Sequence, residues 1–118
     1  MDSNHLKNRT KAFSLQILKF IESLPNGSAG RAIGNQLVRS GTSVGANYRA
    51  VCRSRSKAEF IARLGVVEEE ADESAFWLEL ILESDLAPKE KAEPLLKEAN
   101  ELVAIMAASR KSAKRNKV

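Results

Sequence analysis

The sequence predicts an all-α protein that folds as an up-down-up-down antiparallel four-helix bundle. Apolar residues recur every three or four positions through four long segments, which is the period of an amphipathic helix. Short breaks containing Pro, Gly, Ser or Arg separate these segments. The composition agrees, because 43% of the 118 residues are hydrophobic, only 5% are aromatic and there are only three prolines. A chain of this length forms one domain, so residues 1–118 are expected to make a single bundle.

The first helix is expected from Thr10 to Leu24. Its apolar residues fall on one helical face. They are Phe13, Ile17, Phe20, Ile21 and Leu24. Residues 1–9 are mostly polar and are expected to form a flexible arm. The run from Pro25 to Ser28 breaks the helix, and the Ser28 hydroxyl is placed to cap the next one.

The second helix is expected from Ser28 to Cys52. Its apolar stripe consists of Ile33, Leu37, Val44, Tyr48 and Val51. Gly34, Gly41 and Gly45 interrupt this helix, and each glycine costs about 1 kcal/mol relative to alanine. The glycines therefore predict a close approach by a neighbouring helix. A backbone turn at an active site is the other interpretation, but the helical period continues across all three.

The third helix follows a turn from Arg53 to Ser56 and is expected to run to about Ser84. Ser56 and Glu59 have the spacing of a capping box, in which the two side chains bond to early backbone N–H groups. The buried stripe is expected to consist of Phe60, Leu64, Val67, Ala71, Ser74, Leu78 and Ile81. From Phe76 to Leu82 the helix is apolar almost all round, which predicts that this part lies in a subunit interface.

The fourth helix starts at either Pro88 or Pro94, because a proline inside a helix removes a backbone hydrogen bond. Its apolar stripe consists of Leu95, Ala99, Leu102 and Met106. The helix is expected to fray after Arg110. Residues 111–118 are rich in lysine and are expected to form a flexible basic tail.

Basic and acidic residues are separated along the chain. Between Ser23 and Ala58 there are six basic residues and no acid. The stretch from Glu59 to Asp85 contains nine acids and one basic residue, Arg63. After Glu101 every charged residue is basic. These blocks either pair with one another inside a bundle or assembly, or form separate surfaces that meet a polyanion.

Two polar residues of the second helix, Asn47 and Arg49, lie in a segment rich in small and apolar residues. We expect both to be at least half-buried, with Arg49 paired to a carboxylate of the third helix. The residues expected in this buried polar or assembly group are Asn47, Arg49, Glu69, Glu70, Glu73 and Trp77.

No pattern of catalytic, cofactor-binding or metal-binding residues is present. A di-metal bundle needs Glu-x-x-His pairs, and the one histidine, His5, lies in the expected arm. The acids between Glu68 and Glu73 are interpreted as solvated or paired with arginines. Cys52 is expected to be a small core residue or an idle thiol. No glycine-rich phosphate loop is found, so the sequence indicates a protein that is not an enzyme.

The expected location is the cytoplasm. A single cysteine excludes an internal disulfide framework and fits a reducing compartment. The first eleven residues contain no apolar region of the kind found in signal peptides. No window approaches eighteen apolar residues, so no membrane association is predicted.

The stretch Arg39–Asn47 reads RSGTSVGAN. It resembles the R-S-x-S-[IV]-x-A-N signature of a family of four-helix-bundle proteins, many of which are encoded in intervening sequences of bacterial large-subunit ribosomal RNA genes. Glu59, Phe60 and Leu64 and the stretch Phe76–Glu79 resemble later positions of the family. Many members continue with Asn-x-x-Glu-Gly where this chain has Asn-Tyr-Arg-Ala-Val, so no role is assigned to that glutamate.

The resemblance implies a homopentamer in which the bundles form a ring-like barrel. It also implies kinship in fold with accessory proteins of diversity-generating retroelements, which bind nucleic acid and a reverse transcriptase. The family has no established enzymatic activity. The partners implied are other copies of this chain, DNA or RNA, and a partner protein.

Two functions remain open. The first is a nucleic-acid-associated accessory or scaffold protein, with most of the binding supplied by the basic tail. Its candidate binding residues are Arg53, Arg55, Lys57, Arg110, Lys111, Lys114, Arg115 and Lys117. Aromatic residues do not alternate with these cations, so little sequence preference is expected. The second is a purely structural or protein-interaction oligomer, in which the arginines neutralise the acids of the third helix.

Overall fold

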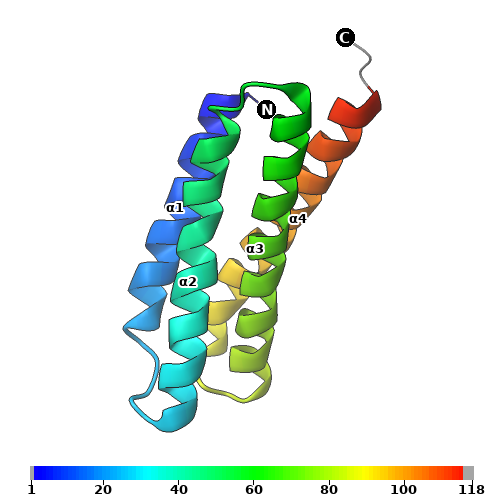
Figure 1. The fold of residues 1–118 in the computed structure, drawn as a ribbon. Helices are drawn as coiled ribbons and strands as arrows, with labels where there is room; N and C mark the ends of the chain where they lie inside the picture. Colours follow the sequence, from blue (N-terminus) through cyan, green and yellow to red (C-terminus); the bar gives the residue numbers. More distant parts are fainter. Residues whose placement is uncertain (1, 116–118) are drawn as a thin grey trace.

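Four helices follow one another in residues 2–115, the part of the chain that the computed structural model describes (Figure 1). They are α1 (Ser3–Ile21), α2 (Ser28–Val51), α3 (Lys57–Glu83) and α4 (Lys89–Arg115). Successive helices run in opposite directions along a body of 51 × 21 × 19 Å. The predicted all-α four-helix bundle is confirmed. No helix among the described residues is long and apolar enough to cross a membrane.

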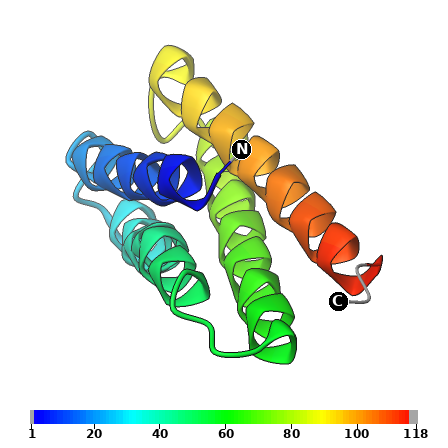
Figure 2. The ribbon, with the colours of Figure 1, turned by 90° about the horizontal axis from the view of Figure 1, so that it is seen from above.

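Each helix packs along the next one in the chain, and α4 returns to α1 through the smallest of the four helix contacts. Seen from the end, α1 and α2 lie side by side, and the C-terminal half of α4 runs away from them (Figure 2). α4 therefore diverges from α1 toward the end that contains the start of α1, the α2–α3 turn and the last turns of α4, which we call the open end (Figures 1 and 2).

The predicted apolar stripes form one core. Residues with no exposed surface come from all four helices, among them Ile17, Val44, Leu78 and Leu102. Ile33 of α2 and Phe60 of α3 lie at the edge of this core and are only partly buried. The periodicity therefore identified which helical faces turn inward, because a stripe of this width must be covered to remove it from water.

The glycines of α2 mark the line along which α1 packs. A Cβ atom placed on Gly41 would lie 2.8 Å from the Ile17 side chain, and one on Gly45 would lie 2.8 Å from the Ser14 hydroxyl. Ser14 Oγ also donates to the carbonyl of Gly41 at 2.8 Å and accepts from the N–H of Gly45 at 3.2 Å. The predicted close approach is confirmed, and the neighbour is α1.

The flexible arm predicted for residues 1–9 is wrong for residues 3–9, which belong to α1. Asp2 caps this helix by accepting from the N–H of His5 at 2.8 Å. Leu6 is only 5% exposed and lies seven residues before Phe13, so it continues the same stripe. Polar neighbours obscured this stripe in the sequence. The helix also ends earlier than predicted, at Ile21 rather than Leu24.

Of the two predicted starts of α4, Pro88 is the correct one, because the helix begins at Lys89. Pro88 precedes the helix, and its carbonyl accepts from the N–H groups of Lys91 and Ala92 at 3.0 and 3.2 Å. Pro94 lies inside the helix at an exposed position. The predicted fraying after Arg110 is wrong for residues 111–115, which remain helical. Residues 116–118, including Lys117, lie outside the described part of the chain.

The predicted capping box at the start of α3 is largely confirmed. Ser56 Oγ accepts from the N–H of Glu59 at 3.0 Å. Glu59 Oε1 accepts from the N–H of Arg55 at 3.3 Å, one residue earlier than the standard motif. At the start of α2 the capping residue is Gly27 rather than the predicted Ser28.

Two glycine-to-alanine changes test the α1–α2 contact. Gly41→Ala is expected to lower the free energy of unfolding by about 1–3 kcal/mol, because the new methyl group must displace Ile17. Gly65→Ala is the matched control in the interior of α3, where the nearest neighbour of a Cβ is the flexible Arg110 side chain at 3.9 Å. This change should stabilise by up to about 1 kcal/mol through helix propensity. Urea denaturation measures both, and equal effects would contradict the close contact.

Candidate nucleic-acid interface

The open end of the bundle collects basic residues from α1, α2 and the α2–α3 turn. A groove of about 310 Å³ runs between α1 and α2 and carries three cations, Lys7 and Lys11 from α1 and Arg49 from α2. The rest of its lining is small or polar. The remaining residues are Asn8, Ser14, Thr42, Gly45 and Ala46. The small side chains follow from the glycine-rich contact, which leaves a shallow channel between the two helices.

A second hollow of about 350 Å³ adjoins this groove and shares Ala46 and Arg49 with it. Its other lining residues are Ala50, Arg53, Arg55 and Arg63. Because the groove and the hollow have two residues in common, their cations form one continuous surface. We call Lys7, Lys11, Arg49, Arg53 and Arg55 the basic surface. All five side chains are exposed.

Within residues 2–115, none of these five cations has a carboxylate within 4.0 Å. Arg63 differs, because it pairs with Glu59 at 3.0 Å and donates to the carbonyl of Ala50 at 2.7 Å. It therefore helps to hold the end of α2 against α3. The basic surface keeps its charge available to an external anion.

The acids of the bundle are paired by other arginines. Arg9 of α1 donates from Nε and Nη2 to both carboxylate oxygens of Glu98 at 2.7 Å, and reaches Glu101 at 3.0 Å. The hydrogen bond to Glu98 is the main reason why the pKa of Arg9 is raised above its ordinary value. This bidentate pair joins α1 to α4, where the two helices otherwise have little contact.

The prediction that Arg49 is half-buried and paired with an acid of α3 is wrong for the single chain. Arg49 is exposed. The arginine that reaches α3 is Arg39, which lies 3.3 Å from Glu70 and also pairs with Glu73. The two arginines are ten residues apart on α2, and the sequence does not show which of them faces α3.

The remaining residues of the predicted buried polar group lie apart from Arg49. Asn47 is partly buried and donates to the carbonyl of Ser43 at 2.8 Å. Glu69 is exposed, whereas Trp77 donates from Nε1 to Glu73 at 3.2 Å. Burial raises the pKa of Glu73, but the bonds from Arg39 and Trp77 lower it further, so the net pKa is below its ordinary value. The charged Glu73 carboxylate therefore contributes to folding stability through these bonds, and this contribution is lost as the pH falls through the lowered pKa.

The predicted basic tail divides into two parts. Arg110 is half-buried and pairs with Glu68 of α3 at 2.7 Å, so it is part of the bundle rather than a free cation. Lys111, Lys114 and Arg115 are exposed on the last turns of α4. The α2–α3 turn lies at the same end of the molecule as these turns (Figure 1).

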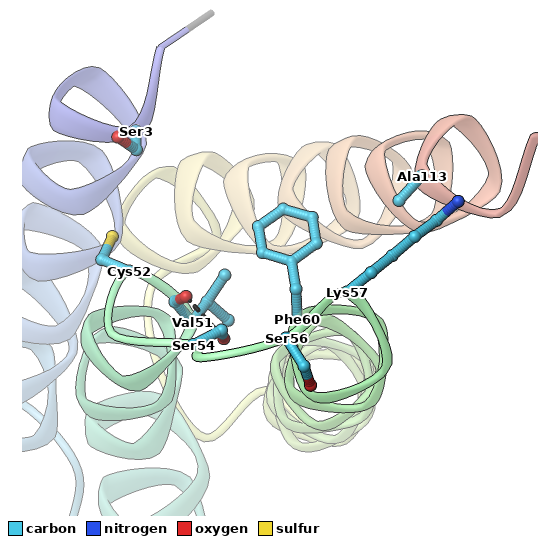
Figure 3. A pocket seen from close by; sticks show the side chains of 8 residues that line it. All are labelled: Ser3, Val51, Cys52, Ser54, Ser56, Lys57, Phe60 and Ala113. Carbon is cyan, nitrogen blue, oxygen red and sulfur yellow. Dashed lines mark hydrogen bonds between the residues drawn. The ribbon is translucent and has the colours of Figure 1, made fainter. Parts of the chain in front are cut away.

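A third hollow, of about 530 Å³, opens at this end between the starts of α1 and α3 and the end of α4 (Figure 3). We call it the end hollow. It is lined by Ser3, Val51, Cys52, Ser54, Ser56, Lys57, Phe60 and Ala113. Cys52 is exposed at its edge, so the core position predicted as one option for this residue is wrong. Within residues 2–115, no group of three or more His, Cys, Asp or Glu residues is placed to hold a metal ion.

Sequence reasoning identified Arg53 and Arg55 but missed Lys7 and Lys11. Lys7 belongs to the segment interpreted as an arm, and Lys11 lies at the start of the helix expected from Thr10. Once that segment is recognised as helical, their spacing of four residues places them on one helical face. The position of that face beside Arg49 depends on how α1 packs on α2.

The fold and the basic end define a class: up-down four-helix-bundle proteins with a cationic surface at one end. The chain belongs to the 23S rRNA-intervening sequence protein family, whose model matches residues 3–108. It is similar to a crystal structure of a protein of unknown function from the S23 ribosomal protein family of Bacteroides thetaiotaomicron VPI-5482. The TM-score is 0.85 at 30% identity, covering 94% of this chain and 99% of the other. Comparison with curated proteins gives no match.

Two arginine-to-alanine changes distinguish a structural from an exposed cation. Arg9→Ala is expected to lower the free energy of unfolding by about 1–2 kcal/mol, because it removes the bidentate link between α1 and α4. Arg49→Ala should change this free energy by less than about 0.5 kcal/mol. Chemical denaturation measures both. A large loss on Arg49→Ala would mean that this side chain is paired after all.

Proposed function

We propose that this protein is a non-enzymatic, homo-oligomeric accessory or scaffold protein that binds the sugar–phosphate backbone of a nucleic acid. The observation that carries the proposal is the basic surface. Five exposed cations on neighbouring elements have no ion-pair partner within residues 2–115, although the bundle contains enough acids to pair several other arginines.

The chemistry of this surface suits phosphate groups. Arginine guanidinium groups bind phosphate oxygens through two parallel hydrogen bonds, and lysine adds a compact point charge. Each phosphate that these cations neutralise releases condensed counterions, which favours binding at low salt. The surface offers cations and small side chains rather than groups that read base edges, so the backbone is its main target.

Self-association is the second part of the proposal. Leu15 and Leu18 of α1 and Val66 and Phe76 of α3 are large apolar side chains that are 40–55% exposed in the single chain. Burial between copies would remove these side chains from water. The family resemblance favours five subunits, and repeating the basic surface around a ring would strengthen binding through avidity.

A purely structural oligomer is the alternative. Several acids of α3 are exposed, including Glu69, Asp72 and Glu79. They are available to neutralise the basic surface of a neighbouring copy. In that case the cations would act between subunits, and the assembled protein would not bind nucleic acid.

The first test is a salt titration of nucleic-acid binding. Fluorescence anisotropy with a mixed-sequence, 20-nucleotide single strand should give an affinity that falls steeply with salt. Arg53→Ala/Arg55→Ala should weaken binding and reduce the salt slope by about 0.7 for each phosphate that the variant no longer neutralises. Arg31→Ala is the matched control, because Arg31 is exposed and belongs to α2 but lies at the opposite end of the bundle.

Equal losses for the double variant and for Arg31→Ala would contradict a localised site. Deleting residues 111–118 measures the share contributed by the last turns of α4 and the tail, which the sequence predicts to be the larger one. No binding by the full-length oligomer at low salt would favour the structural alternative.

The second test concerns assembly. Light scattering at micromolar concentration should give a mass of several chains, with five favoured. Phe76→Asp should lower this mass, because it places a charge in a surface expected to lie between copies. Helical content by circular dichroism should stay unchanged, since Phe76 is 49% exposed in the single chain. A wild-type mass of one chain would refute self-association.

A further inference from the structure

We propose that the end hollow binds one unpaired nucleobase, so that the protein prefers single-stranded nucleic acid, or the end or loop of a folded one, over a continuous duplex. This inference rests on the proposed function, because the backbone bound at the basic surface would deliver the base. It adds a ligand chemistry that the basic surface lacks, namely an apolar face with room for an aromatic ring.

The lining of the end hollow combines the groups that a nucleotide needs. Phe60 and Ala113 supply accessible apolar surface, whereas Val51 is buried beneath the lining, and Figure 3 shows the Phe60 ring projecting between α3 and α4. Ser54 and Ser56 complete the lining from the α2–α3 turn, where the Ser54 hydroxyl donates to the carbonyl of Val51 at 2.7 Å and the Ser56 hydroxyl caps α3. The volume of about 530 Å³ is ample for a single base and its sugar.

A cation stands at the edge of this apolar surface. Lys57 is exposed, extends toward the end of α4 and has no carboxylate within 4.0 Å in the part of the chain described. A base stacked on Phe60 would therefore have an ammonium group close by for its phosphate. Stacking on an aromatic side chain does not depend on which base is bound, because every base has a π-face.

The α2–α3 turn connects the end hollow to the basic surface. Arg53 and Arg55 line the arginine-rich hollow on one side of the turn. Ser54 and Ser56, the alternate residues, line the end hollow on the other side. A strand whose phosphates lie along Arg53 and Arg55 can therefore turn one base across the turn and into the end hollow. A base within a duplex must first break its pairing and stacking, which disfavours the duplex.

The hollow exists because of how the bundle is built. The last turns of α4 run away from α1, and the contact between these two helices is the smallest in the bundle. Phe60 is consequently the one member of the predicted α3 stripe that is only partly buried. Its position at the open end leaves a ring edge and face within reach of a ligand.

The test compares two probes that have the same phosphates. One is a 12-nucleotide oligothymidylate, and the other is an abasic strand of equal length. The wild-type protein should bind the oligothymidylate about 5- to 150-fold more tightly, which is the range expected for stacking one base on an aromatic side chain. Phe60→Leu should remove most of this difference while leaving affinity for the abasic strand unchanged, because leucine keeps apolar volume but has no aromatic face.

Phe76→Leu is the matched control, since Phe76 is an exposed ring on the same helix but does not line the hollow. It should leave the preference intact. Equal binding of both probes by the wild-type protein would overturn the base site and leave the backbone site standing. Loss of the preference in both phenylalanine variants would also overturn this assignment. Binding of neither probe at low salt would overturn the proposed function and the base site together.

Discussion

The close packing of α1 on the glycines of α2 is the contact on which the rest of the structure depends. Gly41 and Gly45 admit Ile17 and Ser14 at distances that a side chain on α2 would not allow. The two helices are therefore close enough for the Ser14 hydroxyl to bond directly to the α2 backbone. The same approach brings the lysines of α1 beside Arg49, so the contact that builds the core also builds the groove.

The distribution of charge follows from this packing. Arg9, Arg39, Arg63 and Arg110 each pair with a carboxylate on another turn or helix, and these pairs tie α1 to α4, α2 to α3 and α3 to α4. They use acids along the length of the bundle and leave the open end cationic. Exposed ion pairs contribute little to stability individually. Their larger effect here is on charge. The paired arginines belong to the bundle, whereas the cations of the basic surface have no carboxylate within 4.0 Å in residues 2–115 and can bind an external anion.

Local patterns predicted most of the fold but only part of the candidate site. The stripes on α2, α3 and α4 could be recognised because large apolar residues repeat at helical spacing. The start of α1 was missed because Leu6 stands alone among polar residues, and its burial depends on other helices. The choice between Arg39 and Arg49 could not be made, since that depends on the rotation of α2 against α3. The end hollow could not be predicted either, because it results from the angle at which α4 leaves α1.

The sequence by itself determined the number of helices, their breaks and their buried faces. These properties depend on interactions between residues a few positions apart, such as the capping of α3 by Ser56 and Glu59 and the heptad-like spacing from Leu64 to Ile81. It also determined that the basic and acidic residues are separated. Only the tertiary structure decided which cations pair with a carboxylate within residues 2–115, and that Lys7 and Lys11 share a groove with Arg49 of α2. The physical reason is that a charge interacts with whatever lies within a few ångströms of it, and that distance is set by the packing of helices far apart in the chain.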